Sequence, residues 1–203
     1  MRKTPSHIQG MTLVELLVTI AIFASIMLVA TIFISNVFSY NTSLSSSYTT
    51  AFDTEILLKT MAKEIRGTSP GSDGAYPIQN AATNTLTFFA DVTGNGVKTR
   101  IRYSYSGTKI FRASLLPSGS PLAYTGSEST TTILNNVRNA TSTPVFEYFN
   151  DLYDGSQSAL PLPVDLAVVH LIKINITLDT DPTKSPNPRT YSTQITLRNL
   201  KNN

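Results

Sequence analysis

The fold of this 203-residue chain is decided by residues 10–38, GMTLVELLVTIAIFASIMLVATIFISNVF. No charged residue occurs between Glu15 and Asp53. A helix rises about 1.5 Å per residue, so roughly 20 apolar residues cross the hydrocarbon core of a bilayer. The stretch therefore predicts a membrane-spanning helix, with Arg2 and Lys3 holding the N-terminus in the cytoplasm.

Glu15 is the residue of this helix that a simple membrane anchor does not explain, because a carboxylate in an apolar span is costly and usually has a functional partner. Cleavage after Gly10 would supply one, since Met11 would gain a cationic amine four residues before Glu15. On a helix this spacing places both groups on one face. Glu15 of one subunit could then neutralise the amine of the next and set the register of assembly within the membrane.

These residues resemble the class III signal peptide of type IV pilins and of the pseudopilins of type II secretion systems. The resemblance implies cleavage after Gly10 by prepilin peptidase, N-methylation of Met11 and filament assembly through Glu15. It also implies partners: other pilin or pseudopilin subunits, the inner-membrane assembly platform and membrane lipid. Met11 departs from the usual Phe, and the helix-bending Pro of many major pilins is absent.

Two other interpretations of the apolar run remain. A cleavable secretory signal would have a shorter apolar core followed by small residues at a cut site, and none follows cleanly here. An uncleaved, membrane-anchored extracytoplasmic binding protein or adhesin would use the apolar run, but it would need neither Gly10 nor Glu15.

Composition narrows the class of function. The chain has no cysteine, which excludes disulfides, thiolate metal sites and cysteine nucleophiles. The formal net charge is +3, but two of the 16 basic residues are Arg2 and Lys3, so the 14 that remain face 13 acidic residues. A net charge of about +1 beyond the leader gives no reason to expect nucleic acid as a partner.

We expect four segments along the chain. They are a leader peptide (1–10), a transmembrane and filament-core helix (11–38), an amphipathic helix half (39–66) and an extracytoplasmic β-sheet domain (67–203).

The helix is expected to continue to Gly67, with weakened helix or a bend in the Ser- and Thr-rich residues 40–50. Beyond that stretch the apolar residues fall on one helical face, which is typical of a helix packed on a sheet. They are Ala51, Leu57, Leu58, Met61, Ala62 and Ile65.

The rest of the chain reads as strands and loops. Gly, Ser, Pro, Asn and Thr enrichment predicts loops at 68–83 and 114–132. Period-two alternation predicts strands, with a tight turn at Ser106-Gly107 and a long hairpin loop at 180–189. The expected strands are 86–88, 101–105, 109–112, 145–149, 172–178 and 191–197. One long helix followed by an antiparallel β-sheet is an α+β fold of the pilin-like kind.

The order of these elements loosely resembles the larger minor pilins, the W-type of type IV pili and the J-type of type II secretion. The resemblance rests on 57–66, 86–88, 102–112, 146–149 and 197–200. It implies a structural minor subunit that initiates assembly or forms the tip. Such a subunit would be a single-pass protein of the cytoplasmic membrane with its C-terminal domain outside, later part of an envelope or surface filament.

Three other motifs carry little chemistry. The acidic loop from Asp91 to Gly96 could offer oxygen ligands to Ca²⁺, but it lacks the carboxylates of an EF-hand and is better explained as a turn. His170 has no accompanying nucleophile elbow. Arg100 and Arg102 alternate with buried positions on a strand, which is ordinary sheet patterning. We therefore expect no enzyme, no catalytic or metal residues and no cofactor.

Overall fold

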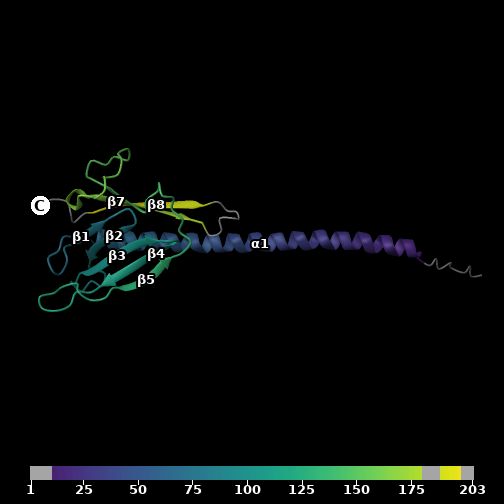
Figure 1. Cartoon of the computed structure of the whole chain (residues 1–203), viewed down its shortest axis with the longest axis horizontal. Coiled ribbons are helices and arrows are strands. Elements are labelled where there is room, and N and C mark those ends of the chain that lie inside the picture. Colours follow the sequence, from purple (N-terminus) through teal and green to yellow (C-terminus); the bar gives the residue numbers. More distant parts are fainter. Residues whose placement is uncertain (1–10, 180–187, 198–203) are drawn as a thin grey trace, which may run out of the picture. The chain divides into compact units, whose positions relative to one another are not determined.

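A computed structural model describes residues 11–179 and 188–197 (Figure 1). The chain divides into two compact units, residues 1–45 and 46–203. In the described ranges the elements follow the order of an α+β fold. They are α1 (Leu13–Arg66), β1 (Ile78–Ala81), β2 (Thr85–Ala90), β3 (Thr99–Ser106), β4 (Lys109–Leu115), β5 (Ser129–Leu134), β6 (Phe146–Phe149), the 3₁₀ helix η1 (Leu166–Val168), β7 (Leu171–Leu178) and β8 (Arg189–Thr196).

Helix α1 runs without interruption through the Ser- and Thr-rich residues 40–50, where the sequence predicted weaker helix. Hydroxyl side chains along α1 donate to the carbonyl four residues earlier, as Thr42 does to Phe38 (2.9 Å) and Thr54 to Thr50 (2.7 Å). Because these hydroxyls bond within the helix, they do not compete for the backbone N–H groups that form it.

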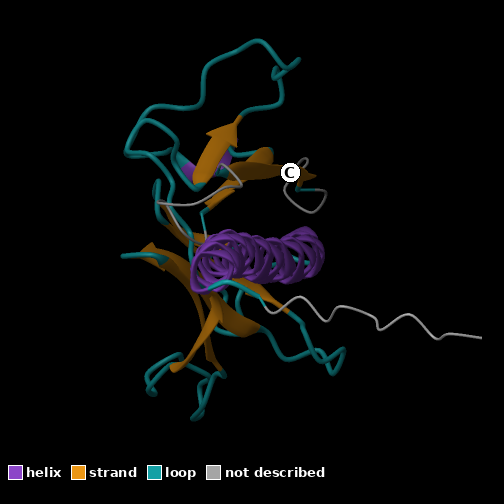
Figure 2. Cartoon of the chain, turned by 90° about the vertical axis from the view of Figure 1, so that its right-hand side faces the viewer, coloured by secondary structure: helices purple, strands orange, loops and turns teal. Residues whose placement is uncertain are grey.

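The strands of the second unit form two antiparallel sheets, where the sequence predicted one. The five-stranded sheet has the order β1-β2-β3-β4-β5, and the three-stranded sheet has the order β6-β7-β8. Figure 2, a view along the helix, shows strands on two sides of α1. The apolar residues 57–65 of α1 span about 140° at 100° per residue, which is wide enough to meet two surfaces.

One core joins the last turns of α1 to both sheets. Met61 and Ile65 are completely buried, and so are Tyr103 of β3 and Ile174 of β7. Other core residues include Leu57, Leu58, Leu86, Phe88, Ile101, Ile110, Ile172, Ile176 and Ile195. Five of the six residues of the apolar face predicted for the second half of the helix are therefore confirmed as buried, and Ala51 is half-buried.

Two loop predictions were wrong. Residues 78–81, inside the predicted 68–83 loop, form β1, which pairs with β2 and buries Ile78 and Ala81. Residues 129–134 form β5, which begins inside the predicted 114–132 loop and pairs with β4. Both strands lie at sheet edges. Their pairing comes from the neighbouring strand, so a short or polar sequence does not reveal it.

Most other strands lie where the alternation of apolar and polar residues predicted them. The β3–β4 hairpin turns at Gly107, whose φ of +62° is in the left-handed region that glycine tolerates. β7 and β8 pair antiparallel in register, with Ile172 opposite Ile195. Part of the predicted 180–189 loop, residues 180–187, lies outside the described ranges.

The second unit should fold without the apolar helix. A fragment from Ser39 to the C-terminus keeps every buried residue of the core, so we expect a soluble monomer with mixed helix and sheet. Circular dichroism and size-exclusion chromatography would measure this, with Met61→Asp as a variant expected to unfold it. A disordered spectrum for the unmodified fragment would contradict the helix-on-sheet core.

Candidate functional site

The described part of the chain begins with a reciprocal cap at the start of α1. The backbone N–H of Thr12 donates to Oε2 of Glu15 (2.9 Å), and the Thr12 hydroxyl donates to the same oxygen (3.0 Å). The N–H of Glu15 donates in turn to the Thr12 hydroxyl (3.3 Å), and the N–H of Leu16 donates to the Thr12 carbonyl (3.1 Å). This is a capping box, in which two otherwise unpaired backbone donors are satisfied by side chains.

The cap fixes the Glu15 carboxylate at the first turn of the helix, where the helix dipole favours negative charge. It also holds that carboxylate against Thr12, the residue next to Met11. Sequence reasoning singled out Glu15 and Met11 but missed Thr12. The available signal was the spacing Thr-x-x-Glu directly before an apolar run.

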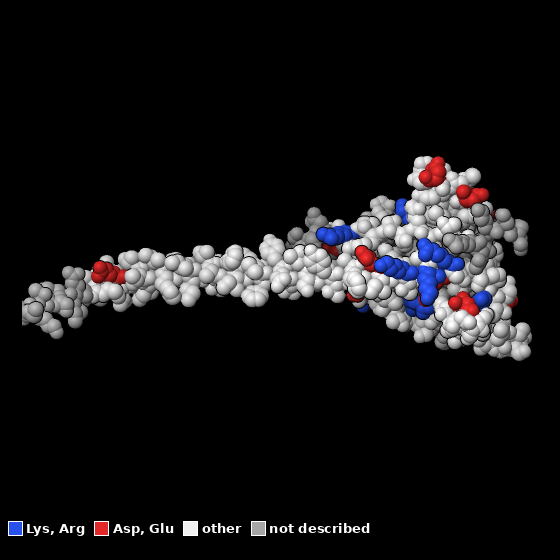
Figure 3. Space-filling view, turned by 180° about the vertical axis from the view of Figure 1, so that it is seen from behind, with Lys and Arg blue, Asp and Glu red and all other residues white. Residues whose placement is uncertain are grey.

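The surface of α1 beyond the cap is apolar and exposed. The large hydrophobic side chains from Leu13 to Phe38 are 48–79% exposed. The hydroxyls of Thr19, Ser25 and Thr31 donate to carbonyls within the helix. Figure 3 shows this long uncharged surface. By length and composition, Leu13–Thr42 could cross a membrane.

In the second unit, Glu64 ties α1 to the five-stranded sheet. Two nitrogens of Arg112 contact its two oxygens, Nη2 to Oε1 at 2.8 Å and Nε to Oε2 at 3.1 Å. The hydroxyl of Tyr103 donates to Oε2. Burial, followed by the negative charge of Glu64, raises the pKa of Tyr103, which keeps the hydroxyl protonated as a donor. Sequence patterning did not predict this cluster, because its members come from three separate elements.

A strap loop, residues 116–128, covers part of the outer face of the same sheet. The ring of Tyr124 packs on Phe89 with centroids 4.8 Å apart. Glu128 bonds Arg100 (3.2 Å) and Nε of Arg102 (3.0 Å). The hydrogen bond from Arg102 is the largest cause that lowers the pKa of Glu128. The two arginines thus lie on the outer face, as predicted, with their charges paired.

The Asp91–Gly96 segment is a turn organised by its own carboxylate. The backbone N–H groups of Gly94 and Gly96 each donate to Asp91 (2.7 Å), and both glycines have positive φ, +73° and +86°. Lys98 lies 3.8 Å from the same carboxylate. Over residues 11–179 and 188–197, the structure places no three His, Cys, Asp or Glu side chains where they could hold a metal ion. His170 donates its backbone N–H to Phe149 (2.9 Å), as a residue at the head of a strand.

Comparison with known proteins points to the N-terminal helix. Residues 5–31 match the family model of the prokaryotic N-terminal methylation motif. No curated protein matches the chain. The matched segment contains Gly10, Met11, Thr12 and Glu15. The match supports a type IV pilin-like protein that is anchored in the membrane by this helix.

Proposed function

We propose that the protein is a minor subunit of a type IV pilus or of a type II secretion pseudopilus, made as a membrane-inserted precursor. Prepilin peptidase cleaves it after Gly10, the new amine of Met11 is methylated, and Glu15 holds the subunit in the filament. The observation that carries this proposal is the Glu15 carboxylate, which is fixed by a cap at the start of an exposed apolar helical segment that has no other charged residue before Asp53, inside an N-terminal methylation motif.

The two halves of α1 suit two successive environments. The 11–38 segment exposes apolar side chains all round, as a helix needs to lie first in lipid and then among other helices in a filament core. The 39–66 segment buries an apolar face in a core, so with 67–203 it forms the domain outside the membrane. The role of the protein is then structural, without catalysis or cofactor, and its partners are other subunits, the peptidase and the assembly platform.

The geometry of the cap leaves Glu15 able to take a partner. Thr12 donates only to Oε2, and within the described ranges no donor contacts Oε1. A carboxylate accepts several hydrogen bonds, so the amine of a neighbouring subunit can bind Oε1 while the cap persists. An adhesin that keeps its leader would have no such amine at Met11.

The position in the filament is the finer part of the proposal. It is supported by the resemblance of the strand order to the larger W-type and J-type minor subunits, and by the absence of a Pro in the apolar helix. A minor subunit of this kind initiates assembly or sits at the tip.

Processing is the direct test. Coexpression with a prepilin peptidase should shorten the chain by the leader, and Gly10→Val should block cleavage, because a branched side chain obstructs access to the backbone at that bond. Gly10→Ala serves as the control with a small side chain, and the peptidase should cleave it more readily than Gly10→Val. Intact-mass spectrometry would read both, and an intact Met1 on filament-associated protein would favour the uncleaved anchor instead.

A further inference from the structure

The outer edge of the three-stranded sheet carries backbone groups that have no partner among residues 11–179 and 188–197. Asn175 donates its backbone N–H to Val145 (2.9 Å), on the β6 side of β7, and it lies opposite Ser192 in the β7–β8 register. That pair is therefore not hydrogen-bonded through the backbone, and the backbone groups of Ser192 point away from β7. Two residues further, those of Gln194 point the same way. Since β8 ends the sheet, these groups face an open edge.

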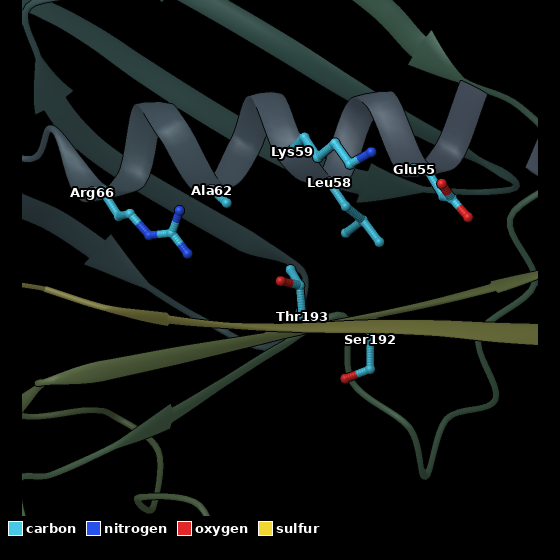
Figure 4. Close-up of a pocket in the computed structure, with 7 residues that line it drawn as sticks. All are labelled: Glu55, Leu58, Lys59, Ala62, Arg66, Ser192 and Thr193. Carbon is cyan, nitrogen blue, oxygen red and sulfur yellow. The ribbon is translucent and has the colours of Figure 1, made fainter. Parts of the chain in front are cut away.

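A groove of about 340 Å³ lies between this edge strand and α1. β8 contributes Ser192 and Thr193, and in Figure 4 Thr193 points towards the helix. The helix contributes an apolar floor, Leu58 and Ala62, and charged side chains along one face. The charged residues are Glu55, Lys59 and Arg66.

The two cations of the groove, Lys59 and Arg66, differ from five other cations of the unit. Lys98, Arg100, Arg102, Arg112 and Lys173 each lie in an ion pair with a carboxylate. Lys59 and Arg66 have no ion-pair partner in the part of the chain that the structure describes, and neither does Lys63, which follows Lys59 by one helical turn. Figure 3 shows basic side chains gathered on one face of this unit.

We propose that the groove binds an extended acidic segment of a partner protein, added to β8 as a further strand. The open backbone groups of Ser192 and Gln194 would pair with the backbone of that segment, which is the main-chain part of recognition by strand addition. Lys59 and Arg66 would pair with its carboxylates, which selects for acidic residues.

A second copy of this chain fits the groove less well. The strand it would offer, β8, carries only one charged residue, Arg189, so it would bring no carboxylate to Lys59 or Arg66. The inference does not depend on the proposed role in a filament, because it rests on the second unit alone.

The test is binding of a labelled synthetic peptide of about ten residues, in which valine alternates with glutamate and threonine, to the full chain in detergent micelles. Fluorescence anisotropy should give saturable binding that weakens as salt is raised. Lys59→Glu and Arg66→Glu should each weaken binding about tenfold or more. Lys109→Glu, at the exposed β3–β4 hairpin, is the matched control and should bind as the native chain does.

Strand addition is tested by altering the backbone on either side. Gln194→Pro removes an outward N–H that β7 does not use, and an edge strand tolerates such a proline. It should abolish binding, and so should N-methylation of alternate residues of the peptide, which leaves the protein unchanged. Equal binding of a peptide with glutamine for glutamate, or of the N-methylated peptide, would overturn the proposal. A dimer of the native chain that Gln194→Pro converts to monomer would overturn it in favour of pairing between copies.

Discussion

Replacing Glu15 with Leu is expected to leave membrane insertion and cleavage intact and to prevent the subunit from entering filaments. Leu suits an apolar helix, so insertion should be unaffected or improved. In an assembled filament, however, the Met11 amine of the neighbouring subunit would be buried without a partner. Breaking one side of a buried ion pair in this way should lower incorporation by about a hundredfold or more.

The capping box provides the controls that separate charge from helix capping. Glu15→Gln keeps a side chain that can accept the N–H of Thr12, since either Glu or Gln serves at this position of the box, but it removes the charge. It should therefore fail almost as completely as Glu15→Leu. Thr12→Ala removes the hydroxyl contacts of the cap and keeps the charge, so its defect should be much smaller. Glu15→Asp should be intermediate, because the shorter side chain reaches less far.

Incorporation would be measured by coexpressing each variant with its partner subunits and quantifying it in sheared filaments or in crosslinked subunit complexes. Processing by the peptidase would be followed in the same cells, so that loss of cleavage is not mistaken for loss of assembly. Normal incorporation of Glu15→Gln would show that an ion pair does not assemble this protein and would leave Glu15 with its capping role alone.

Replacing Glu64 with Leu is expected to lower the free energy of unfolding of the second unit by about 2–3 kcal/mol. The substitution leaves two groups without the carboxylate that they bind, the guanidinium of Arg112 and the hydroxyl of Tyr103. The value lies below that of a fully buried pair because the Arg112 side chain is 25% exposed and water can reach it. Urea unfolding of the fragment from Ser39 onward would measure it.

A double-mutant cycle tests whether the loss comes from the pair. Adding Arg112→Met to Glu64→Leu should recover part of the stability, because no unpaired, partly buried guanidinium then remains between α1 and the sheet. Glu55→Leu, at an exposed position of the same helix, is the control and should change the free energy of unfolding by about 0.5 kcal/mol or less. Equal losses for the Glu64 and Glu55 variants would show that Glu64 does not hold α1 on the sheet.

The sequence was most informative where a single segment carries its own physical pattern. The uncharged run after Glu15 predicted the long helix, and alternation predicted β7 and β8 because each has one face against a core. The Thr-x-x-Glu cap was equally local and could have been found. By contrast, β1 and β5 are strands because β2 and β4 pair with them, so their own sequences resembled loops.

The sequence alone therefore determined the apolar helix, its lone carboxylate, the buried face of its second half and the α+β class, since each depends on residues close together in the chain. Only the tertiary structure decided that the strands divide into two sheets, that Glu64 meets Arg112 and Tyr103, and that β8 leaves an open edge beside Lys59 and Arg66. Those contacts join residues tens of positions apart. Their formation depends on how the core packs, and no local periodicity encodes that.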